Sequence, residues 1–289
     1  MIDLDALARP AGTFVMVAMD QRESLRAMLA EHHADATAER MVRFKLAVAR
    51  ELGAYASGFL VERGQAYAEI VRERLLPSSC GLILAADALE QPPGGIVEDT
   101  DIDPGVDPAA ACSDGAVALK LLVIWRDCGD RDRIVDTVRR FVALARADGL
   151  LSVVEPVTRG PEGFDRERAI LEAAVALGPL GCDLYKCEVP THGAAPDAEI
   201  TRWCRLIDEA LPCPWVVLSQ GVPPDRFPAA VGAACRGGAS GALAGRAVWT
   251  AALPGDDPTE LLRRHSVPRL RELAEIVDRD GCSWRDKRP

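Results

Sequence analysis

The sequence lacks paired cysteines of the kind that staple small secreted proteins or bind zinc. Its nine cysteines include no C-x-x-C pair, and an odd number leaves at least one of them unpaired. Four lie in or beside apolar stretches: Cys80, Cys182, Cys187 and Cys213. Because a free cysteine behaves as a small buried hydrophobe, we expect reduced thiols and a cytoplasmic protein rather than a disulfide framework.

Long apolar runs and basic clusters are also missing. Every apolar run is shorter than ten residues, whereas a membrane-spanning helix needs about 20. The opening residues, MIDLDALARP, carry acids instead of the apolar core of a secretory signal. The net charge is -10, and the longest basic cluster is RDKR near the C-terminus. Nucleic-acid-binding proteins usually present a basic face, so we expect neither a nucleic acid nor a membrane as a partner.

Histidine is scarce as well, and the usual sequence motifs of serine nucleophiles and dinucleotide binding are absent. The four histidines form no group with metal-ligand spacing. No G-x-S-x-G marks a serine nucleophile, and no G-x-G-x-x-G follows the first apolar stretch, as dinucleotide binding would require. We therefore expect no metal and no cofactor.

Lysine is the rarest of the charged residues. Only four of the 34 basic residues are lysine. A sequence that uses arginine wherever a solvated positive charge suffices draws attention to the lysines that it keeps. Two of them, Lys120 and Lys186, interrupt apolar stretches with the character of β-strands.

What the chain does contain is a regular alternation of short apolar stretches and longer segments of helical periodicity. The composition, 48% hydrophobic and 27% charged, is that of a globular protein. Eight strands are predicted: Thr13–Met19, Gly58–Val61, Gly81–Ala85, Ala118–Trp125, Leu150–Glu155, Cys182–Glu188, Trp215–Ser219 and Gly241–Ala244. Six helices are predicted between and after them: Glu39–Leu52, Asp130–Arg146, Asp165–Leu177, Asp197–Leu211, Pro224–Arg236 and Pro258–Asp280.

This alternation indicates an α/β protein with a parallel sheet. Eight strand–helix units in one chain fit a closed (β/α)8 barrel better than an open doubly wound sheet. We predict one barrel domain over residues 1–289. The acidic segment at about 86–113 shows no clear helix, and we predict an elaborated loop there, after the third strand.

Active sites of such barrels lie at the carboxyl ends of the strands, and Lys186 gives the sharpest signal there. Alternation along the strand places Leu184, Lys186 and Glu188 on one face. Burial in the barrel mouth lowers the pKa of a lysine, and a neutral amine can attack a carbonyl to form a Schiff base. The alternative is a structural ion pair of Lys186 with Glu155 or Glu188.

Other strand ends supply possible helpers. Lys120 could keep Lys186 deprotonated, bind a substrate oxygen, or neutralise an interior carboxylate. Glu155 suits proton transfer, or else a salt bridge to either lysine. Asp20 could act at the site or simply cap the next helix. We expect Glu62 and Asp87 to be solvated loop acids.

Two strand-to-helix turns indicate an anion site. One contains Ser219 and Gly221, and the other contains Gly245 and Arg246. Barrel enzymes often bind phosphate with the turns after strands seven and eight. Glycine allows the backbone to approach the anion, and arginine adds a charged fork. The alternative is a pair of tight turns with a surface arginine.

These segments together resemble the class I aldolases of the tagatose-1,6-bisphosphate aldolase family, and within it the bacterial sulfofructose-1-phosphate aldolase branch. The resemblance runs in order from about residue 12 to 250. It rests on the segments AMDQRESLRAML, FKLAVARELGAYASGFLVE, ALKLLVIWR, GLLSVVEPV, FDRERAILEAA, GCDLYKCEVP, PWVVLSQGV and GASGALAGRAVW.

The resemblance implies a barrel that cleaves a ketose phosphate to dihydroxyacetone phosphate and an aldehyde. It implies catalytic roles for Lys186, the Schiff-base lysine, and for Glu155, Lys120 and Asp20. It implies substrate-binding roles for Gln21, Arg22, Ser219, Gly221, Gly245 and Arg246. Departures from the family pattern at Thr191-His192-Gly193 and Gln220 bear on the far end of the substrate.

The substrate expected from the resemblance is 6-deoxy-6-sulfofructose 1-phosphate, which yields sulfolactaldehyde as the second product. One alternative is a tagatose- or fructose-1,6-bisphosphate aldolase. Another is a non-catalytic barrel that binds sugar phosphates and would not need Lys186 and Glu155 together. We also expect a homo-oligomer.

Overall fold

The computed structural model describes residues 3–93, 95–126 and 130–287. Its eight barrel strands are β1 (Phe14–Met19), β2 (Gly58–Glu62), β3 (Gly81–Ala85), β6 (Ala116–Arg126), β7 (Leu151–Arg159), β8 (Leu184–Glu188), β9 (Trp215–Leu218) and β10 (Gly241–Ala244). They close in the order β1-β10-β9-β8-β7-β6-β3-β2, and every neighbouring pair is parallel. The predicted (β/α)8 barrel is therefore confirmed.

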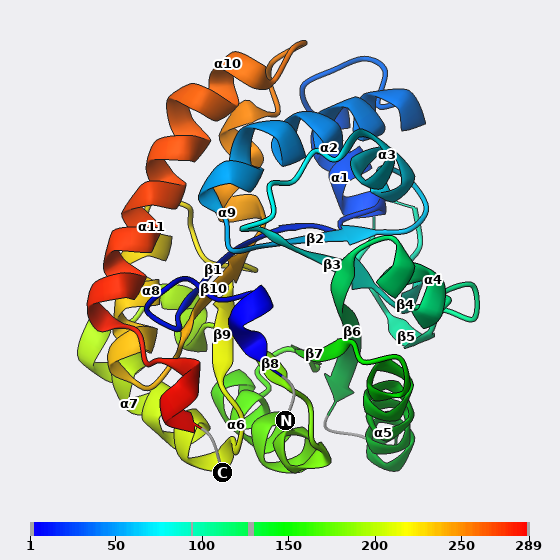
Figure 1. Cartoon of the computed structure of the whole chain (residues 1–289). Helices are drawn as coiled ribbons and strands as arrows, with labels where there is room; N and C mark the ends of the chain where they lie inside the picture. The colour runs from blue at the N-terminus through cyan, green and yellow to red at the C-terminus, as the bar shows by residue number, and fades with distance from the viewer. Residues whose placement is uncertain (1–2, 94, 127–129, 288–289) are drawn as a thin grey trace.

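Helices surround the barrel in Figure 1 and connect successive strands. The longer ones are α1 (Glu23–Ala30), α2 (Ala38–Leu52), α3 (Tyr67–Glu73), α5 (Arg131–Ala147), α6 (Arg166–Leu177), α7 (Asp197–Ala210), α8 (Phe227–Arg236) and α11 (Val267–Asp280), with the short α9 (Arg246–Trp249) and α10 (Thr259–Leu261). No helix in the described ranges combines the length and the apolar character that a bilayer span requires. The last predicted helix, Pro258–Asp280, is divided by a π-helical turn at Leu262–Ser266.

Helix α2 shows why these segments fold as they do. Thr37 caps the helix, because its hydroxyl accepts a hydrogen bond from the backbone N–H of Arg40 at 3.2 Å. Met41, Phe44 and Val48 recur at helical spacing and are buried against the barrel. Each fully buried side chain of this size contributes about 1.5–3 kcal/mol to folding.

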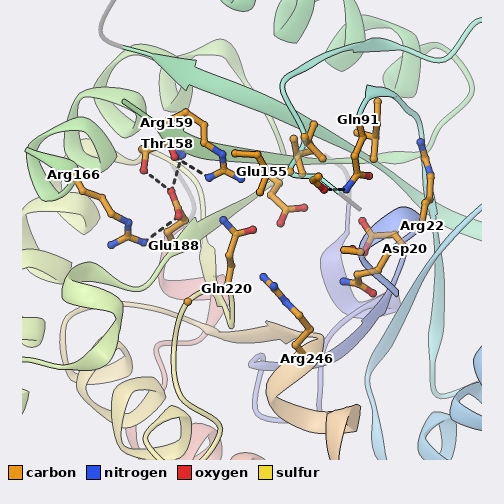
Figure 2. Close-up of a pocket in the computed structure, with 18 of the residues that line it drawn as sticks. Asp20, Arg22, Gln91, Glu155, Thr158, Arg159, Arg166, Glu188, Gln220 and Arg246 are labelled. Atoms are coloured by element: carbon orange, nitrogen blue, oxygen red, sulfur yellow. Dashed lines mark hydrogen bonds and ion pairs between the residues drawn. The ribbon is translucent and has the colours of Figure 1, made fainter. Parts of the chain in front are cut away.

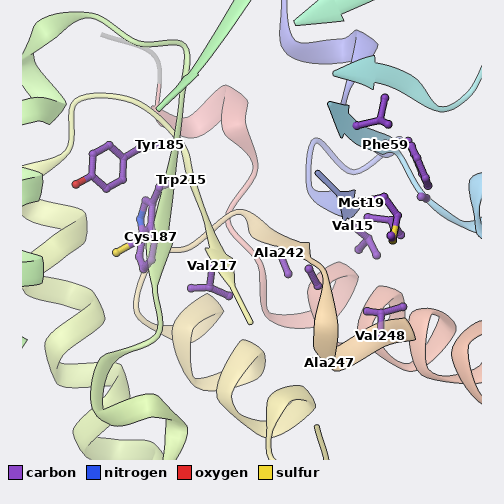
Figure 3. Packing of buried hydrophobic residues seen from close by; sticks show 14 of the residues in the cluster. Val15, Met19, Phe59, Tyr185, Cys187, Trp215, Val217, Ala242, Ala247 and Val248 are labelled. Atoms are coloured by element: carbon purple, nitrogen blue, oxygen red, sulfur yellow. The ribbon is translucent and has the colours of Figure 1, made fainter. Parts of the chain in front are cut away.

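Two apolar layers follow from the alternation of side chains along the strands. Leu184 of β8 belongs to the cluster that fills the barrel interior. Tyr185 and Cys187 of the same strand belong to the outer cluster between barrel and helices, part of which is shown in Figure 3. Every strand thus presents one face inward and one face to the helices. The alternation predicted for the Lys186 strand is confirmed.

The segment between β3 and β6 contains an antiparallel hairpin, β4 (Asp87–Glu90) with β5 (Asp99–Ile102), and a short helix, α4 (Pro108–Ser113). The expectation that this segment has no clear helix was wrong. Asp107 caps α4 by accepting hydrogen bonds from the N–H groups of Ala109 and Ala110, and Pro108 occupies the first turn. A helix of six residues is too short to show an amphipathic period, so its caps were the only sequence signal.

The cysteines of the described ranges are free thiols. Cys80, Cys182, Cys187 and Cys213 are all buried, as predicted. The sulfur atoms of Cys182 and Cys213 lie 3.8 Å apart, which is contact rather than a bond.

Candidate active site

Two buried lysines and one glutamate form the centre of the barrel mouth. The Nζ of Lys120 on β6 lies 2.8 Å from Oε2 of Glu155, and the Nζ of Lys186 lies 2.8 Å from Oε1 of the same carboxylate. The three residues come from the neighbouring strands β6, β7 and β8, and their side chains point inward. The lysine side chains are 1% and 4% exposed. The structure therefore brings together the two predicted lysines and the predicted glutamate, and the ion pairs of Glu155 with both lysines, considered as alternatives, are also present.

Lys120 has two further carboxylate partners. Its Nζ lies 2.8 Å from Oδ2 of Asp20 and 2.9 Å from Oδ2 of Asp87. Burial lowers the pKa of Lys120, but the charges of Asp20, Asp87 and Glu155 outweigh burial and raise the pKa well above its ordinary value. Lys120 is consequently a fixed ammonium ion. An ammonium ion has no lone pair, so Lys120 is unsuited to nucleophilic attack.

Asp20 belongs to this network and does not cap a helix. The residue at the N-cap of α1 is Arg22, and its side chain forms no capping bond. Burial raises the pKa of Asp20, but the charges of Lys120 and Lys186 lower it by more, so the net shift is downward. Asp20 stays ionised, and its charge is directed to the lysines.

Lys186 differs from Lys120 in the number of its carboxylate partners. Within the described ranges its ammonium contacts the single carboxylate of Glu155, which it shares with Lys120. A proton on Lys186 therefore has one acceptor at hydrogen-bond distance, the Oε1 of Glu155. This arrangement is the one expected of a nucleophilic amine beside its general base.

The expectation that Glu62 and Asp87 are solvated loop acids was wrong. Each is 2% exposed. Glu62 pairs with Lys45 of α2 at 2.6 Å. Asp87 accepts from Lys120 and from Arg22, whose Nη2 also donates to the Asp87 carbonyl. The scarcity of lysine was a usable signal for Lys45, since three of the four lysines turn out to be buried ion-pair partners.

The two predicted phosphate turns lie side by side. The hydroxyl of Ser219 accepts from the N–H groups of Gly245 and Ala247 at 3.3 and 3.5 Å. Gly221 has a φ of +76°, and any side chain there would collide with the imidazole of His192. Arg246 stands at the start of α9, and in the described ranges its guanidinium has no carboxylate at ion-pair distance. Burial lowers the pKa of Arg246, against the opposing charge of Glu155.

A cavity of about 530 Å³ opens above this centre. Figure 2 shows Asp20, Glu155 and Arg246 around it. Gln21 and Arg22 also line it, and the Oε1 of Gln21 is buried without a hydrogen-bond partner. Residues of the β4–β5 hairpin, among them Gln91, form part of its wall. Seven of the ten predicted site residues line the cavity, and Lys186, Ser219 and Gly245 do not. Lys186 lies beneath it, in contact with Glu155, and Ser219 lies behind the phosphate turns.

A second polar group on the cavity wall was not predicted. Glu188 accepts from the N–H and the hydroxyl of Thr158 at 2.7 and 2.8 Å, and from Nη2 of Arg166 at 3.0 Å. Glu188 is thus not a partner of Lys186. Arg159 follows Thr158 and donates from Nη1 to the Thr158 carbonyl at 2.9 Å. Prediction ended this strand at Glu155 because a proline comes next, whereas β7 continues to Arg159 in register with β6.

His192 borders the same cavity in an unusual backbone conformation. Thr191 and His192 have φ values of +56° and +48°, a region that residues other than glycine rarely adopt. Burial and the nearby Arg166 lower the pKa of His192. The imidazole is therefore neutral at pH 7 and available as a hydrogen-bonding group. No set of three or more histidine, cysteine, aspartate or glutamate side chains suited to a metal ion occurs in residues 3–93, 95–126 and 130–287.

Comparison with known proteins gives consistent matches over nearly the whole chain. A tagatose 1,6-diphosphate aldolase of Streptococcus agalactiae is 23% identical, covering 98% of this chain and 97% of its own length. One from Staphylococcus epidermidis is 26% identical with the same coverage. Among solved structures, fructose-bisphosphate aldolase from Plasmodium falciparum has a TM-score of 0.70 at 15% identity, covering 96% of this chain and 93% of its own.

A second solved structure is an archaeal fructose-1,6-bisphosphate aldolase with its catalytic lysine covalently bound to the carbinolamine intermediate of the substrate. It has a TM-score of 0.61 at 20% identity, covering 95% of this chain and 98% of its own. At these identities the two structures establish the shared barrel. The model of the family described as "DeoC/LacD family aldolase" matches residues 14–251, from β1 to the turn after α9. The chain therefore belongs to the DeoC/LacD family of aldolases, and it is a class I aldolase, a carbon–carbon lyase.

Proposed function

We propose that this aldolase cleaves 6-deoxy-6-sulfofructose 1-phosphate to dihydroxyacetone phosphate and sulfolactaldehyde through a Schiff base on Lys186. The observation that carries the mechanism is the contrast between the two buried lysines. Lys120 is held as an ammonium ion by three carboxylates, whereas Lys186 touches only the shared carboxylate of Glu155.

The first step is attack of the Lys186 amine on the C2 ketone. Glu155 lies 2.8 Å from Nζ and takes a proton from the lysine, which leaves a lone pair for the attack. The carbinolamine then loses its hydroxyl as water, with the proton returned by Glu155. The product is an iminium ion, which accepts electrons from the bond that breaks next.

The second step is cleavage between C3 and C4. Glu155, again a carboxylate, removes the proton of the C4 hydroxyl, the C3–C4 electrons flow to the iminium, and the aldehyde leaves. The same proton is then delivered to C3 of the enamine, and water hydrolyses the iminium to release dihydroxyacetone phosphate and restore Lys186. The ion pair with Lys120 positions Glu155, and Asp20 orients the substrate hydroxyls.

The two turns after β9 and β10 are the proposed site for the C1 phosphate. Arg246 supplies a charge that no carboxylate in the described ranges neutralises. Gly221 and Gly245 leave room for a ligand beside the backbone, and Ser219 fixes the relation of the two turns through its bonds to Gly245 and Ala247. The lysine that reacts at C2 lies on β8, and the turns that bind the C1 phosphate follow the next two strands of the barrel, β9 and β10.

A sulfonate at C6 is favoured by sequence resemblance and by charge. A sulfonate is a permanent monoanion with three acceptor oxygens, whereas a phosphate ester carries about -1.5 to -2 at pH 7. A sulfonate site needs donors but less positive charge. The neutral His192, which lines the cavity after β8, provides a hydrogen-bonding group without positive charge.

The second candidate substrate is tagatose or fructose 1,6-bisphosphate. It is favoured by the two relatives described above, both named tagatose 1,6-diphosphate aldolases. The three substrates are compared by measuring the release of dihydroxyacetone phosphate under identical conditions. We expect the highest kcat/KM with the sulfosugar. A tenfold preference for either bisphosphate, about 1.4 kcal/mol in transition-state binding, would overturn the substrate and leave the lysine chemistry intact.

We also propose a cellular compartment and an oligomeric state for the enzyme. Free buried thiols suit a reducing compartment, and we place the enzyme in the cytoplasm as a homo-oligomer. Gel filtration with light scattering checks the second point, and a monomer at working concentration would refute it.

A further inference from the structure

The charges around the cavity divide into balanced groups and two unbalanced arginines. One balanced group has three cations and three carboxylates: Arg22, Lys120 and Lys186 with Asp20, Asp87 and Glu155. A second is the pair of Arg166 and Glu188 at 3.0 Å. Arg159 and Arg246 belong to neither group. In a protein with a net charge of -10, two uncompensated cations on one cavity are a specific feature.

Arg159 is held in place but not neutralised. Its Nη1 donates to the carbonyl of Thr158, while its Nε is buried with no hydrogen-bond partner. Glu188 is the nearby carboxylate, but both of its oxygens are occupied by Thr158 and Arg166. Burial lowers the pKa of Arg159, and the charges of other arginines lower it further against the opposing charge of Glu188. A half-buried guanidinium in positive surroundings is stabilised by an anionic ligand.

The two unbalanced arginines approach one cavity from different strands. Arg159 ends β7 and Arg246 follows β10, and β8 and β9 lie between these strands in the barrel. Figure 2 shows both guanidinium groups directed toward the space beside Glu155, with Gln220 between them. A sugar with an anionic group at each end satisfies both arginines. One of these groups is the C1 phosphate, already placed at Arg246.

We propose that Arg159 binds the second anionic group of the substrate, the sulfonate or phosphate on C6. This inference rests on the proposed function, because it takes the C1 phosphate to lie at Arg246. Arg22 is then not the residue that binds the anionic group on C6. The guanidinium of Arg22 already pairs with Asp87 at 3.0 Å and bonds the Asp87 carbonyl at 2.9 Å, so its charge is compensated.

The test compares substrates with and without a charge at C6. Wild type and Arg159→Gln are assayed with 6-deoxy-6-sulfofructose 1-phosphate, fructose 1,6-bisphosphate and fructose 1-phosphate. Loss of a charge-assisted hydrogen bond should lower kcat/KM by roughly 10- to 100-fold for the two substrates that carry an anionic group at both ends. The value for fructose 1-phosphate should fall by no more than about threefold. The larger loss among the first two identifies sulfonate or phosphate as the group that Arg159 prefers.

Two variants control this comparison. Arg159→Lys keeps the positive charge and should recover part of the loss. Arg139→Gln removes an exposed arginine of α5 outside the cavity and should leave all three values unchanged. Equal losses of Arg159→Gln on all three substrates would overturn the proposal, because a residue that acts on the lysine chemistry or on folding cannot discriminate at C6.

A binding measurement separates this proposal from the proposed function. If wild type releases no dihydroxyacetone phosphate from any of the three sugars, the function is wrong. Calorimetry with 3-sulfolactate, a small organosulfonate that cannot form a Schiff base, then tests Arg159 alone. Affinity at least tenfold weaker in Arg159→Gln than in Arg139→Gln supports the anion site, and equal affinities refute it.

Discussion

Replacing Lys120 by methionine should destabilise the protein severely at neutral pH. The ammonium of Lys120 lies 2.8, 2.9 and 2.8 Å from the carboxylates of Asp20, Asp87 and Glu155. At an effective dielectric constant near 20, each contact contributes about 6 kcal/mol of gross attraction, much of which desolvation offsets. Removing one partner of a buried ion pair typically costs about 3–5 kcal/mol. With three carboxylates left behind, we expect a loss of about 5 kcal/mol in the free energy of unfolding.

Solvent screening reduces this figure little, because the side chains are 1% exposed for Lys120 and 11%, 1% and 8% for its three partners. A matched control is Lys287→Met. The Lys287 ammonium lies 2.8 Å from a single carboxylate, that of Asp208, and its side chain is 19% exposed. A surface pair of this kind contributes about 0–1 kcal/mol. Urea unfolding at pH 7.5 measures both losses.

The loss of unfolding free energy in Lys120→Met should also depend on pH, and it should be smaller at acidic pH. In the wild type the pKa of Asp20 is lowered, so its stabilisation is present above about pH 4 and disappears as the pH falls through the lowered value. Without Lys120, burial acts on Asp20 against less opposing charge, and the pKa of Asp20 rises. Asp20 then takes up a proton at a higher pH than in the wild type, and the difference in unfolding free energy between variant and wild type should narrow as the pH falls. A loss below about 1.5 kcal/mol, or one that is the same at pH 7.5 and 4.5, would show that Lys120 does not neutralise the buried carboxylates.

Arg246→Ala should weaken the binding of dihydroxyacetone phosphate by about 2–3 kcal/mol in calorimetry, the scale of a lost charge-assisted partner, and unchanged affinity would place the phosphate elsewhere. Gly221→Ala should lower the free energy of unfolding by about 1–2 kcal/mol, because φ is +76° there and the new methyl group meets His192; a melting temperature equal to wild type would contradict this. EDTA should leave kcat unchanged, and activity that falls with EDTA and returns with a divalent ion would show that the lysine chemistry is incomplete.

The fold could be predicted from sequence because parallel barrel strands are buried on both faces and read as continuous apolar runs. Alternation alone then placed Lys186 inside the barrel and Tyr185 outside it. Strand ends were less predictable. Pro156 marked a false end of β7, although the barrel tolerates a proline there and the pairing with β6 continues to Arg159.

Burial of single carboxylates could not be predicted in this way. Asp87 begins the hairpin after β3, in a segment rich in acids, and nothing local distinguishes it from a solvated residue. Its burial depends on Lys120, which lies 33 positions along the chain. Glu62 depends in the same manner on Lys45. Long-range ion pairs of this kind leave no periodic trace in the sequence, and the scarcity of lysine was the only indication of them.

Reductive trapping tests most directly whether Lys186 is the nucleophile. Borohydride is added to the enzyme in the presence of dihydroxyacetone phosphate, and the digested protein is examined by mass spectrometry. We expect a stable adduct on the peptide that contains Lys186, in wild type and in Arg159→Gln alike, and none in Lys186→Met. An adduct on the Lys120 peptide, or an active preparation that shows no adduct at all, would contradict the assignment of Lys186 as the nucleophile.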